Sequence, residues 1–350
     1  MIERLLVIRL SAMGDVAMTV PVIAELAIAN PNIKITVLSR DFLRPLFEKL
    51  PDNVDFIGFD PKQKHSSFKG LNMLFKELKA KKFDAVADLH DVIRTKYLRL
   101  RFSLRGVKVV HIDKGRAEKK ALVKHEIHTQ LTPTIERYRT VFRNLGLNVG
   151  GAGFTSIFNG GKADLQPIAE LLKIDSSKRA NEAWIGVAPF AAHKGKAYPV
   201  ESMRACVEML AAKSGNRVFC FGAGPSETAV LQQWEAQNVH CVAGKMRLKQ
   251  ELELMSNLDV MVSMDSANMH LASLVSVPVV SIWGATHPFA GFMGYKQSED
   301  NAVQLDLPCR PCSIYGNKPC TNGQQFECMS IPPKIVVDRV EKVIDQNRVR

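Results

Sequence analysis

The sequence predicts an α/β protein made of two domains, each with a parallel sheet. Short apolar runs alternate with amphipathic helical segments, which is the pattern of right-handed βαβ units. This alternation stops in a glycine-rich stretch near the middle and then starts again. The 350 residues are also too many for one ordinary hydrophobic core. We therefore expect two open sheets that face a cleft between the domains.

The first half supplies the first sheet. Asn30-Pro31 closes an early helix, and apolar residues at 71, 74, 75 and 78 give a later one its helical period. The expected strands are Arg4–Leu10, Lys34–Ser39, Val54–Phe59, Ala85–Leu89 and Val107–His111; the expected helices are Val16–Ala29, Leu43–Leu50, Leu71–Lys81 and Thr95–Leu104.

Six glycines and a polar Ser-Ser-Lys-Arg run make residues 146–180 the expected connection between domains. We place the first domain at 1–165, the second at 180–332, and a final helix at 333–350 that packs back toward the first. The expected strands of the second half are Trp184–Ala188, Arg217–Phe221, Val239–Val242, Val260–Met264 and Val279–Trp283; its expected helices are Val200–Lys213, Glu227–Gln237, Leu248–Asn257, Ala267–Val275 and Pro333–Asn347.

Composition is that of a soluble globular protein, with 46% hydrophobic and 23% charged residues. No apolar stretch is long enough to span a bilayer. The apolar core near the N-terminus is too short for a signal peptide and suits a first buried strand. We therefore expect a cytoplasmic protein.

Seven cysteines divide into two groups. Cys206, Cys220 and Cys241 lie in apolar runs and are expected to be buried. The other four crowd one Pro/Gly/Asn-rich stretch: Cys309, Cys312, Cys320 and Cys328. Their spacing is not that of a standard zinc finger, so reduced thiols in a packed loop are preferred to a structural zinc or a disulfide. We assign no metal ligand.

The net charge of +12 is concentrated in one segment. Residues 94–124 contain eleven Lys or Arg and only two acids, Asp113 and Glu118. Such a segment attracts polyanions such as nucleic acid, anionic lipid or a phosphorylated substrate. A solvated basic surface is the alternative.

The most informative motif is Asp265-Ser266-Ala267-Asn268-Met269-His270, directly after the apolar run 258–264. It places an acid at the carboxyl end of a strand and at the start of a helix, where ligands bind in open α/β sheets. A phosphate-bearing sugar suits this position, because the helix start holds phosphate and the carboxylate accepts from hydroxyls. A simple helix N-cap is the competing interpretation.

Three further loops follow expected strands. Ser11-Ala12-Met13-Gly14-Asp15 has one glycine and an acid, which suits a proton acceptor better than a dinucleotide and disfavours a nicotinamide oxidoreductase. Lys194 and Lys196 could neutralise a diphosphate, or be solvated. Glu227 follows a lone G-x-G, which by itself indicates only a tight turn, but its carboxylate could reach a ribose or sugar hydroxyl.

Together these motifs resemble glycosyltransferase family 9, the bacterial lipopolysaccharide heptosyltransferases. The resemblance rests on Arg9 to Val16, on Met264 to Ala272, on Trp283-Gly284-Ala285-Thr286-His287-Pro288, and on Lys196-x-Tyr198-Pro199. It covers most of the chain. It implies the GT-B architecture and an inverting, metal-independent transfer from ADP-heptose to the lipopolysaccharide inner core, with no further cofactor.

The resemblance also implies roles for individual residues. Asp15 would be the general base. The donor would be held by Lys194, Lys196, Glu227, Asp265, Ser266, Ala267, Asn268, Met269, His270 and Thr286. The acidic glycolipid acceptor would meet Ser11, Met13, Gly14, Arg94, Arg99, Arg101, Lys114, Arg116 and Lys120.

Four positions depart from the family pattern. Ala267 and Ala285 replace a glycine and a proline that are usual there, and Ala191-Ala192 replace hydroxyl residues. These changes bear on the identity of the donor more than on the reaction.

We accordingly expect a heptosyltransferase that works in the cytoplasm at the periphery of the inner membrane, without a nucleic-acid partner. A nucleotide-sugar epimerase of the same architecture is one alternative. A basic protein that binds nucleic acid or anionic lipid without catalysis is the other, although the basic segment lacks the aromatic interleaving of nucleic-acid modules.

Overall fold

The computed structural model describes residues 2–151, 153–159, 161–179, 181–320, 322–323 and 326–348. The chain divides into two compact units. Unit 1 comprises Met1–Lys114 and Thr132–Ile157, and unit 2 comprises Gly115–Leu131 and Phe158–Arg350. The segment 115–131 therefore belongs to unit 2, whereas the sequence pattern placed it inside a first domain of residues 1–165.

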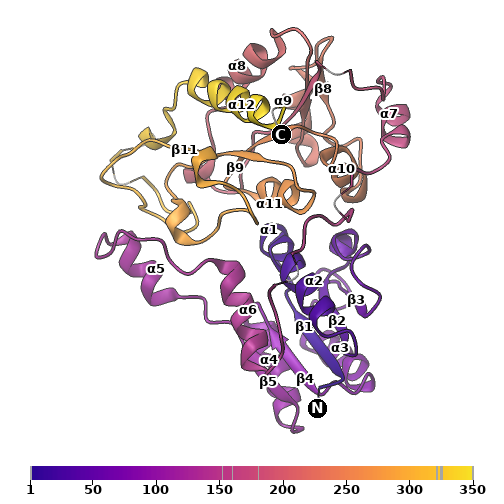
Figure 1. The fold of residues 1–350 in the computed structure, drawn as a ribbon. Helices are drawn as coiled ribbons and strands as arrows, with labels where there is room; N and C mark the ends of the chain where they lie inside the picture. The colour runs from indigo at the N-terminus through magenta and orange to yellow at the C-terminus, as the bar shows by residue number, and fades with distance from the viewer. Residues whose placement is uncertain are drawn as a thin grey trace. The chain divides into compact units, whose positions relative to one another are not determined.

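Unit 1 contains a five-stranded parallel sheet in the order β3-β2-β1-β4-β5 (Figure 1). The strands are β1 (Arg4–Ile8), β2 (Lys34–Arg40), β3 (Val54–Phe59), β4 (Ala85–Asp88) and β5 (Lys108–His111). Its helices are α1 (Met13–Ala17), α2 (Thr19–Ala29), α3 (Phe68–Ala80), α4 (Ile93–Ser103) and α6 (Thr134–Asn144). β1 and β4 are buried along almost their whole length, as expected of central parallel strands.

The helices of unit 1 differ from expectation at three places. The predicted helix 16–29 is two helices, α1 and α2, which meet at Met18. The predicted helix 43–50 is a 3-10 helix, Asp41–Leu46, because Pro45 has no N–H to donate inside an α-helix. Helix α6 was not predicted.

Unit 2 contains a six-stranded parallel sheet in the order β11-β10-β9-β6-β7-β8. The strands are β6 (Ala183–Ala188), β7 (Asn216–Cys220), β8 (Val239–Cys241), β9 (Val260–Met264), β10 (Val279–Ile282) and β11 (Ala302–Val303). Its helices are α5 (Arg116–Val123), α7 (Gln166–Leu172), α8 (Val200–Ala211), α9 (Gly224–Gln232), α10 (Leu248–Met255), α11 (Ala267–Leu274) and α12 (Pro333–Arg348). Five of these strands match predicted ones, while β11, α5 and α7 were not predicted.

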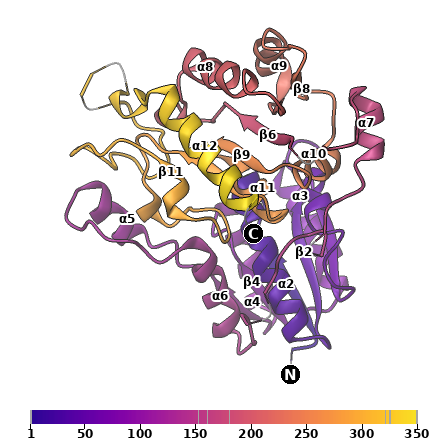
Figure 2. The same cartoon turned by 45° about the horizontal axis from the view of Figure 1, so that its top comes forward.

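The last helix is part of the second core. Val336, Val337 and Val340 of α12 are buried in the same apolar cluster as the strands of unit 2. Both views show α12, in yellow, beside α8 (Figure 2). The apolar face of α12 is thus used by its own unit, and the packing of residues 333–350 toward the first domain stays a prediction.

Two predictions about burial can also be compared with the structure. Cys206, Cys220 and Cys241 are buried, as predicted from their apolar surroundings. None of the helices in the described ranges has the length and apolar character needed to cross a bilayer.

Candidate active site

The loops after β1 and β4 meet at one edge of the sheet in unit 1. The two strands are neighbours, and Ile8 at the end of β1 pairs with Asp88 at the end of β4. Their carboxyl ends are thus level, so the chain that follows each strand must share the same space. This edge is where open α/β sheets bind ligands.

Asp15 is fixed at this edge by two contacts. Its Oδ2 lies 2.6 Å from Nη2 of Arg9 and accepts a hydrogen bond of 3.1 Å from the backbone N–H of Ala12. Asp15 belongs to the first turn of α1, whose N-cap is Ala12, so it is not the N-cap itself. Its side chain remains 31% exposed. The carboxylate is therefore oriented yet still open to a ligand.

Arg9 is buried and reaches three groups from the end of β1. Nη1 donates to the carbonyl oxygen of Leu89 at 2.7 Å, and the guanidinium lies 5.9 Å from the ring centre of Tyr138. Burial disfavours its charge, but Tyr138 and the Asp15 carboxylate outweigh this effect and raise the pKa of Arg9. The hydroxyl of Tyr138 donates to the carbonyl of Asp15 at 3.3 Å. Arg9 therefore holds the carboxylate of Asp15, and Tyr138 holds its backbone carbonyl.

His90 completes the cluster as a neutral group. Its Nδ1 accepts from the N–H of Leu10 at 3.3 Å, and its Nε2 lies 3.5 Å from the hydroxyl of Ser11. Burial, followed by the positive charges of Arg9 and Lys114, lowers the pKa of His90 to about 3. A ring that accepts at Nδ1 carries its proton on Nε2, so it points a donor at Ser11.

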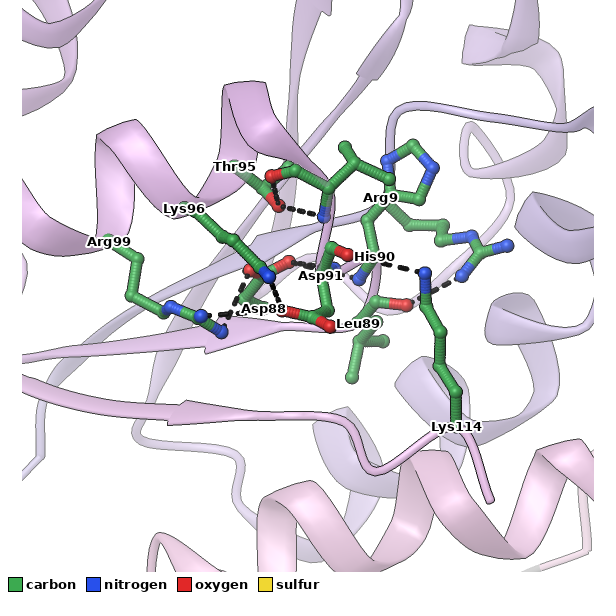
Figure 3. Close-up of polar contacts among 10 residues, drawn as sticks. Arg9, Asp88, Leu89, His90, Asp91, Thr95, Lys96, Arg99 and Lys114 are labelled. Carbon is green, nitrogen blue, oxygen red and sulfur yellow. Dashed lines mark hydrogen bonds and ion pairs between the residues drawn. The ribbon is translucent and has the colours of Figure 1, made fainter. Parts of the chain in front are cut away.

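Two acids and two cations lie beside this cluster (Figure 3). Asp88 is fully buried, and its Oδ1 accepts from the N–H groups of His90 and Asp91 at 2.9 and 3.0 Å. Arg99 lies 3.4 Å from Asp88 and 3.3 Å from Asp91, while Lys96 lies 3.6 Å from Asp91. Lys96, Arg99 and Lys114 lower the pKa of Asp91 although burial acts in the opposite direction.

The predicted acceptor residues fall in three places. Ser11, Met13 and Gly14 lie in the loop and helix that carry Asp15, and Lys114 donates to the Asp91 carbonyl at 3.3 Å. Arg94 is exposed in the first turn of α4. Arg101 lies further along α4, where its Nη1 donates to Asn72 at 2.7 Å, away from the Asp88–Asp91 turn. Arg116 and Lys120 are exposed on α5, in unit 2.

In unit 2 the central pair is Lys196 and Asp265. They follow β6 and β9, which are hydrogen-bonded neighbours, and their side chains form an ion pair of 2.8 Å. Asp265 is only 4% exposed. It precedes Ser266, the N-cap of α11, so the interpretation of Asp265 as a plain N-cap is wrong. A buried acid paired with a lysine at a helix start is a polar anchor for a ligand that carries hydroxyls and phosphate.

Gly195 joins this pair to the loop after β10. Its N–H donates to the carbonyl of Gly316 at 3.1 Å, and its carbonyl accepts from Ala285 at 2.8 Å. A Cβ at position 195 would lie 2.8 Å from both the Ala285 Cβ and the Gly316 oxygen. Only glycine therefore permits this close approach of three loops.

Arg310 holds the far side of the same loop. Its buried guanidinium donates to the carbonyl oxygens of Gly284, Trp283 and Thr286. Burial lowers the pKa of Arg310. Burial, followed by the positive charge of Arg310, lowers the pKa of the neighbouring His287 to about 4. The main chain around Thr286 is thus immobilised by a side chain from the cysteine-rich segment.

The remaining donor-site predictions differ in what surrounds them. Thr286 is fully buried, and its Oγ1 has no hydrogen-bond partner among the described residues. Glu227 accepts from the N–H of Ala223 at 2.7 Å, which gives it a structural role at the start of α9. Lys194 is exposed. In the first turns of α11, Ser266, Ala267 and Asn268 are half-buried, whereas Met269 and His270 are buried.

The cysteine-rich segment shows no preformed metal site in the part of the chain that is described. No group of three or more His, Cys, Asp or Glu side chains gathers there to hold a metal ion. Cys309, Cys312 and Cys320 are half-buried, Cys328 is buried, and all four are free thiols in this structure. Burial raises the pKa of Cys328 to about 11.

Sequence analysis missed Arg9, His90 and Arg310 as members of the site. The signal for His90 was available, because His90 comes two residues after the apolar run of β4 and thus follows a strand end. Arg9 begins the stretch Arg9 to Val16 that carries the family resemblance. A charged residue at the end of a buried strand does not by itself show which residue it pairs with. Arg310 lies 24 residues beyond Thr286, so only the fold brings them together.

Two parallel α/β units with polar loops at the carboxyl ends of their strands are the architecture of the GT-B fold of glycosyltransferases, which nucleotide-sugar epimerases share. The model of glycosyltransferase family 9 (heptosyltransferase) matches residues 71–322. The lipopolysaccharide core heptosyltransferase OpsX of Haemophilus influenzae is 24% identical over 296 residues, which make up 82% of this chain and 80% of OpsX.

Solved structures agree with the sequence comparison. A family 9 glycosyl transferase from Veillonella parvula superposes with a TM-score of 0.74 at 22% identity, covering 98% of each chain. The E. coli heptosyltransferase WaaC with ADP gives a TM-score of 0.67 at 19% identity and covers 97% of this chain and 99% of WaaC. The chain belongs to glycosyltransferase family 9, the heptosyltransferases, and its predicted GT-B fold is confirmed.

Proposed function

We propose that this glycosyltransferase moves a heptose from ADP-heptose to an acidic lipopolysaccharide inner-core acceptor, with inversion at the anomeric carbon. The observation that carries the proposal is the placement of Asp15. Its carboxylate is exposed at the ligand-binding edge of unit 1, yet is held in one orientation by Arg9 and Ala12.

The reaction is a single displacement. Asp15 accepts the proton of an acceptor hydroxyl as that oxygen bonds to the anomeric carbon, and the bond from this carbon to the ADP phosphate oxygen breaks. An aspartate carboxylate is a weak base for an alcohol, so correct placement of the acceptor hydroxyl must contribute much of the rate. General-base assistance itself is worth about 10²–10⁴-fold.

The donor is assigned to unit 2. Charge grows on the diphosphate as it leaves, and Lys196 with the first N–H groups of α11 would stabilise it. Asp265 would accept from a sugar hydroxyl while it holds Lys196 in place. Thr286, whose hydroxyl is buried without a described partner, is the further donor contact that this geometry favours. Lys194 is exposed, so its side chain would turn toward the diphosphate only when the donor binds.

The acceptor is assigned to unit 1. Arg94 is exposed three residues after Asp91, and Lys114 donates to the Asp91 carbonyl at 3.3 Å. Both cations suit the phosphates and carboxylates of a core oligosaccharide. Arg99 is already shared by Asp88 and Asp91, so it would position the turn more than it binds acceptor. A glycolipid acceptor also places the enzyme at the periphery of the inner membrane.

Family membership favours a transferase over both alternatives, the epimerase and the non-catalytic binder. The decisive experiment incubates the purified chain with ADP-heptose, with and without a heptose-deficient core acceptor, and follows both products by mass spectrometry. We expect a heptosylated acceptor and ADP only when both substrates are present. An isomerised ADP-sugar without acceptor would overturn the proposal, and transfer from UDP- or GDP-sugars alone would change the donor.

A further inference from the structure

Helix α4 has two apolar faces, and only one of them is covered. Thr95, Leu98 and Phe102 are buried against unit 1. Residues seven and eleven positions after Ile93 return to the same side of a helix with 3.6 residues per turn, so Leu100 and Leu104 align with Ile93. This second face is opposite the buried one, and its three side chains are 82%, 58% and 73% exposed, respectively.

An aromatic ring extends this exposed face. Phe68, at the start of α3, is 70% exposed and packs edge-on against Tyr97 of α4 with 6.0 Å between ring centres. Tyr97 is itself anchored by a hydrogen bond to Asn72 on α3. Phe68, Ile93, Leu100 and Leu104 are called the α4 patch below. Single exposed apolar residues are ordinary, but four large ones on one pair of helices mark an interaction surface.

The α4 patch is bordered by cations. Residues 93–105 contain Arg94, Lys96, Arg99, Arg101 and Arg105, and no acid. The guanidinium carbons of Arg101 and Arg105 lie 4.5 and 5.0 Å from the ring centre of Phe75. Arg101 also donates to Asn72 and Tyr97, so its charge is engaged within unit 1, whereas Arg94 and Arg105 are exposed. Exposed aliphatic side chains on a helix lined by Arg and Lys are the composition of helices that lie in the interface of anionic membranes.

We propose that the α4 patch docks this enzyme on an anionic phospholipid surface. Its aliphatic and aromatic tips enter the boundary between headgroups and acyl chains, and the exposed Arg94 and Arg105 meet lipid phosphates. A nucleic acid would satisfy the cations but leave Leu100 and Leu104 in water. A second copy of the chain would bring the same cations face to face.

Docking has a consequence for catalysis. Ile93 begins α4 two residues after Asp91, so the patch starts at the same sheet edge that carries Asp15. This edge would then be close to a membrane-borne acceptor, a consequence that rests on the proposed function. The docking itself does not depend on it.

Vesicle flotation of the full-length chain tests the proposal. We expect binding to phosphatidylcholine vesicles with about 30% phosphatidylglycerol and at least tenfold weaker binding to phosphatidylcholine alone. The double variant Leu100→Ser/Leu104→Ser should bind the anionic vesicles at least tenfold more weakly. The matched control Leu171→Ser/Ile335→Ser removes two exposed aliphatic side chains from unit 2 and should bind as the wild type does.

Two further measurements separate insertion from charge attraction and from activity. Leu100→Trp should be quenched by brominated lipid, whereas Leu171→Trp should not. Activity on a soluble, delipidated core acceptor should be unchanged in Leu100→Ser/Leu104→Ser, so failure of docking and failure of the proposed reaction are distinguishable. The docking proposal is overturned if the wild type does not float with anionic vesicles, if the double variant floats equally well, or if its only effect is to dissolve a dimer in light scattering.

Discussion

Arg9 Nη2 and Asp15 Oδ2 are 2.6 Å apart, in an ion pair that joins the end of β1 to the first turn of α1. The arginine is buried and the aspartate is one-third exposed. A carboxylate whose cation comes from the protein interior keeps its orientation when solvent is displaced by a ligand. The ion pair therefore fixes the orientation of the Asp15 carboxylate at the ligand-binding edge of unit 1.

Replacement of Asp15 by Asn tests its role as base. The variant keeps the shape of the side chain but cannot accept the proton, so kcat should fall at least about 100-fold while donor affinity stays within about twofold. Steady-state kinetics and calorimetric titration with ADP measure the two effects. Asp52→Asn, in an exposed turn of the same unit, serves as control. Near-normal turnover of Asp15→Asn would assign the base elsewhere.

Replacement of Arg9 tests a positioning residue. Without the neighbouring cation the carboxylate of Asp15 is harder to ionise, so the acidic limb of the kcat profile should move to higher pH in Arg9→Met. Arg9→Lys should restore part of the shift, since it keeps the charge but not the paired contacts to Asp15 and Leu89. An Arg9→Met enzyme with lower kcat but an unmoved pH profile would show that Arg9 acts on the fold alone.

His90 makes the stability of the protein depend on pH. Its folded-state pKa, about 3, is below the ordinary value of 6.5, so the unfolded chain binds the proton first as pH falls. The free energy of unfolding should therefore decrease from pH 7.5 to pH 5.0, with His90 responsible for at most about 2 kcal/mol.

Urea unfolding of His90→Gln at the two pH values checks this contribution. The variant should lose less stability than the wild type over the same interval. His111→Gln, an exposed histidine on β5, should behave as the wild type does. His287, whose pKa is lowered to about 4, also makes the free energy of unfolding decrease as the pH falls. This contribution is the same in the wild type and in both variants, so it cancels in the comparison. Equal slopes for wild type and His90→Gln would contradict the assignment.

Lys196 and Asp265 allow a separation of stability from donor binding. Lys196→Met leaves the acid buried without its cation and should destabilise the protein by about 3 kcal/mol. The double variant Lys196→Met/Asp265→Asn removes both charges and should regain most of that stability. Its kcat/KM for the donor should nevertheless stay at least about 100-fold low, because the diphosphate has lost its lysine. Recovery of activity together with stability would show that the pair is purely structural.

Salt should weaken the binding of the acceptor more than the binding of the donor. Exposed cations such as Arg94 attract an acidic oligosaccharide through charges that ions screen over about 10 Å at 0.1 M salt. Acceptor KM should rise several-fold between 50 and 300 mM NaCl at constant donor KM, and Arg94→Gln should flatten the increase. Kinetics with a soluble acceptor avoid any effect of membrane binding. An acceptor KM that does not change with salt would remove the basic segment from the acceptor site.

The sequence alone determined the alternation of strands and helices and the loops that carry Asp15, Lys196 and Asp265. These are consequences of local apolar period and of residues that start or stop helices, so neighbouring residues suffice to predict them. It could not show that residues 115–131 join unit 2 or that α12 packs on its own sheet. Those outcomes depend on which distant apolar faces find one another.

Only the tertiary structure decided the chemistry around each predicted acid. The pairing of β1 with β4 places His90 and Leu89 against Leu10 and Arg9, some 80 residues away. Burial there makes His90 neutral and gives Arg9 its partner, and burial is a property of the packed chain. The α4 patch has the same origin, because the sequence shows apolar residues all around this helix and the fold covers only one side.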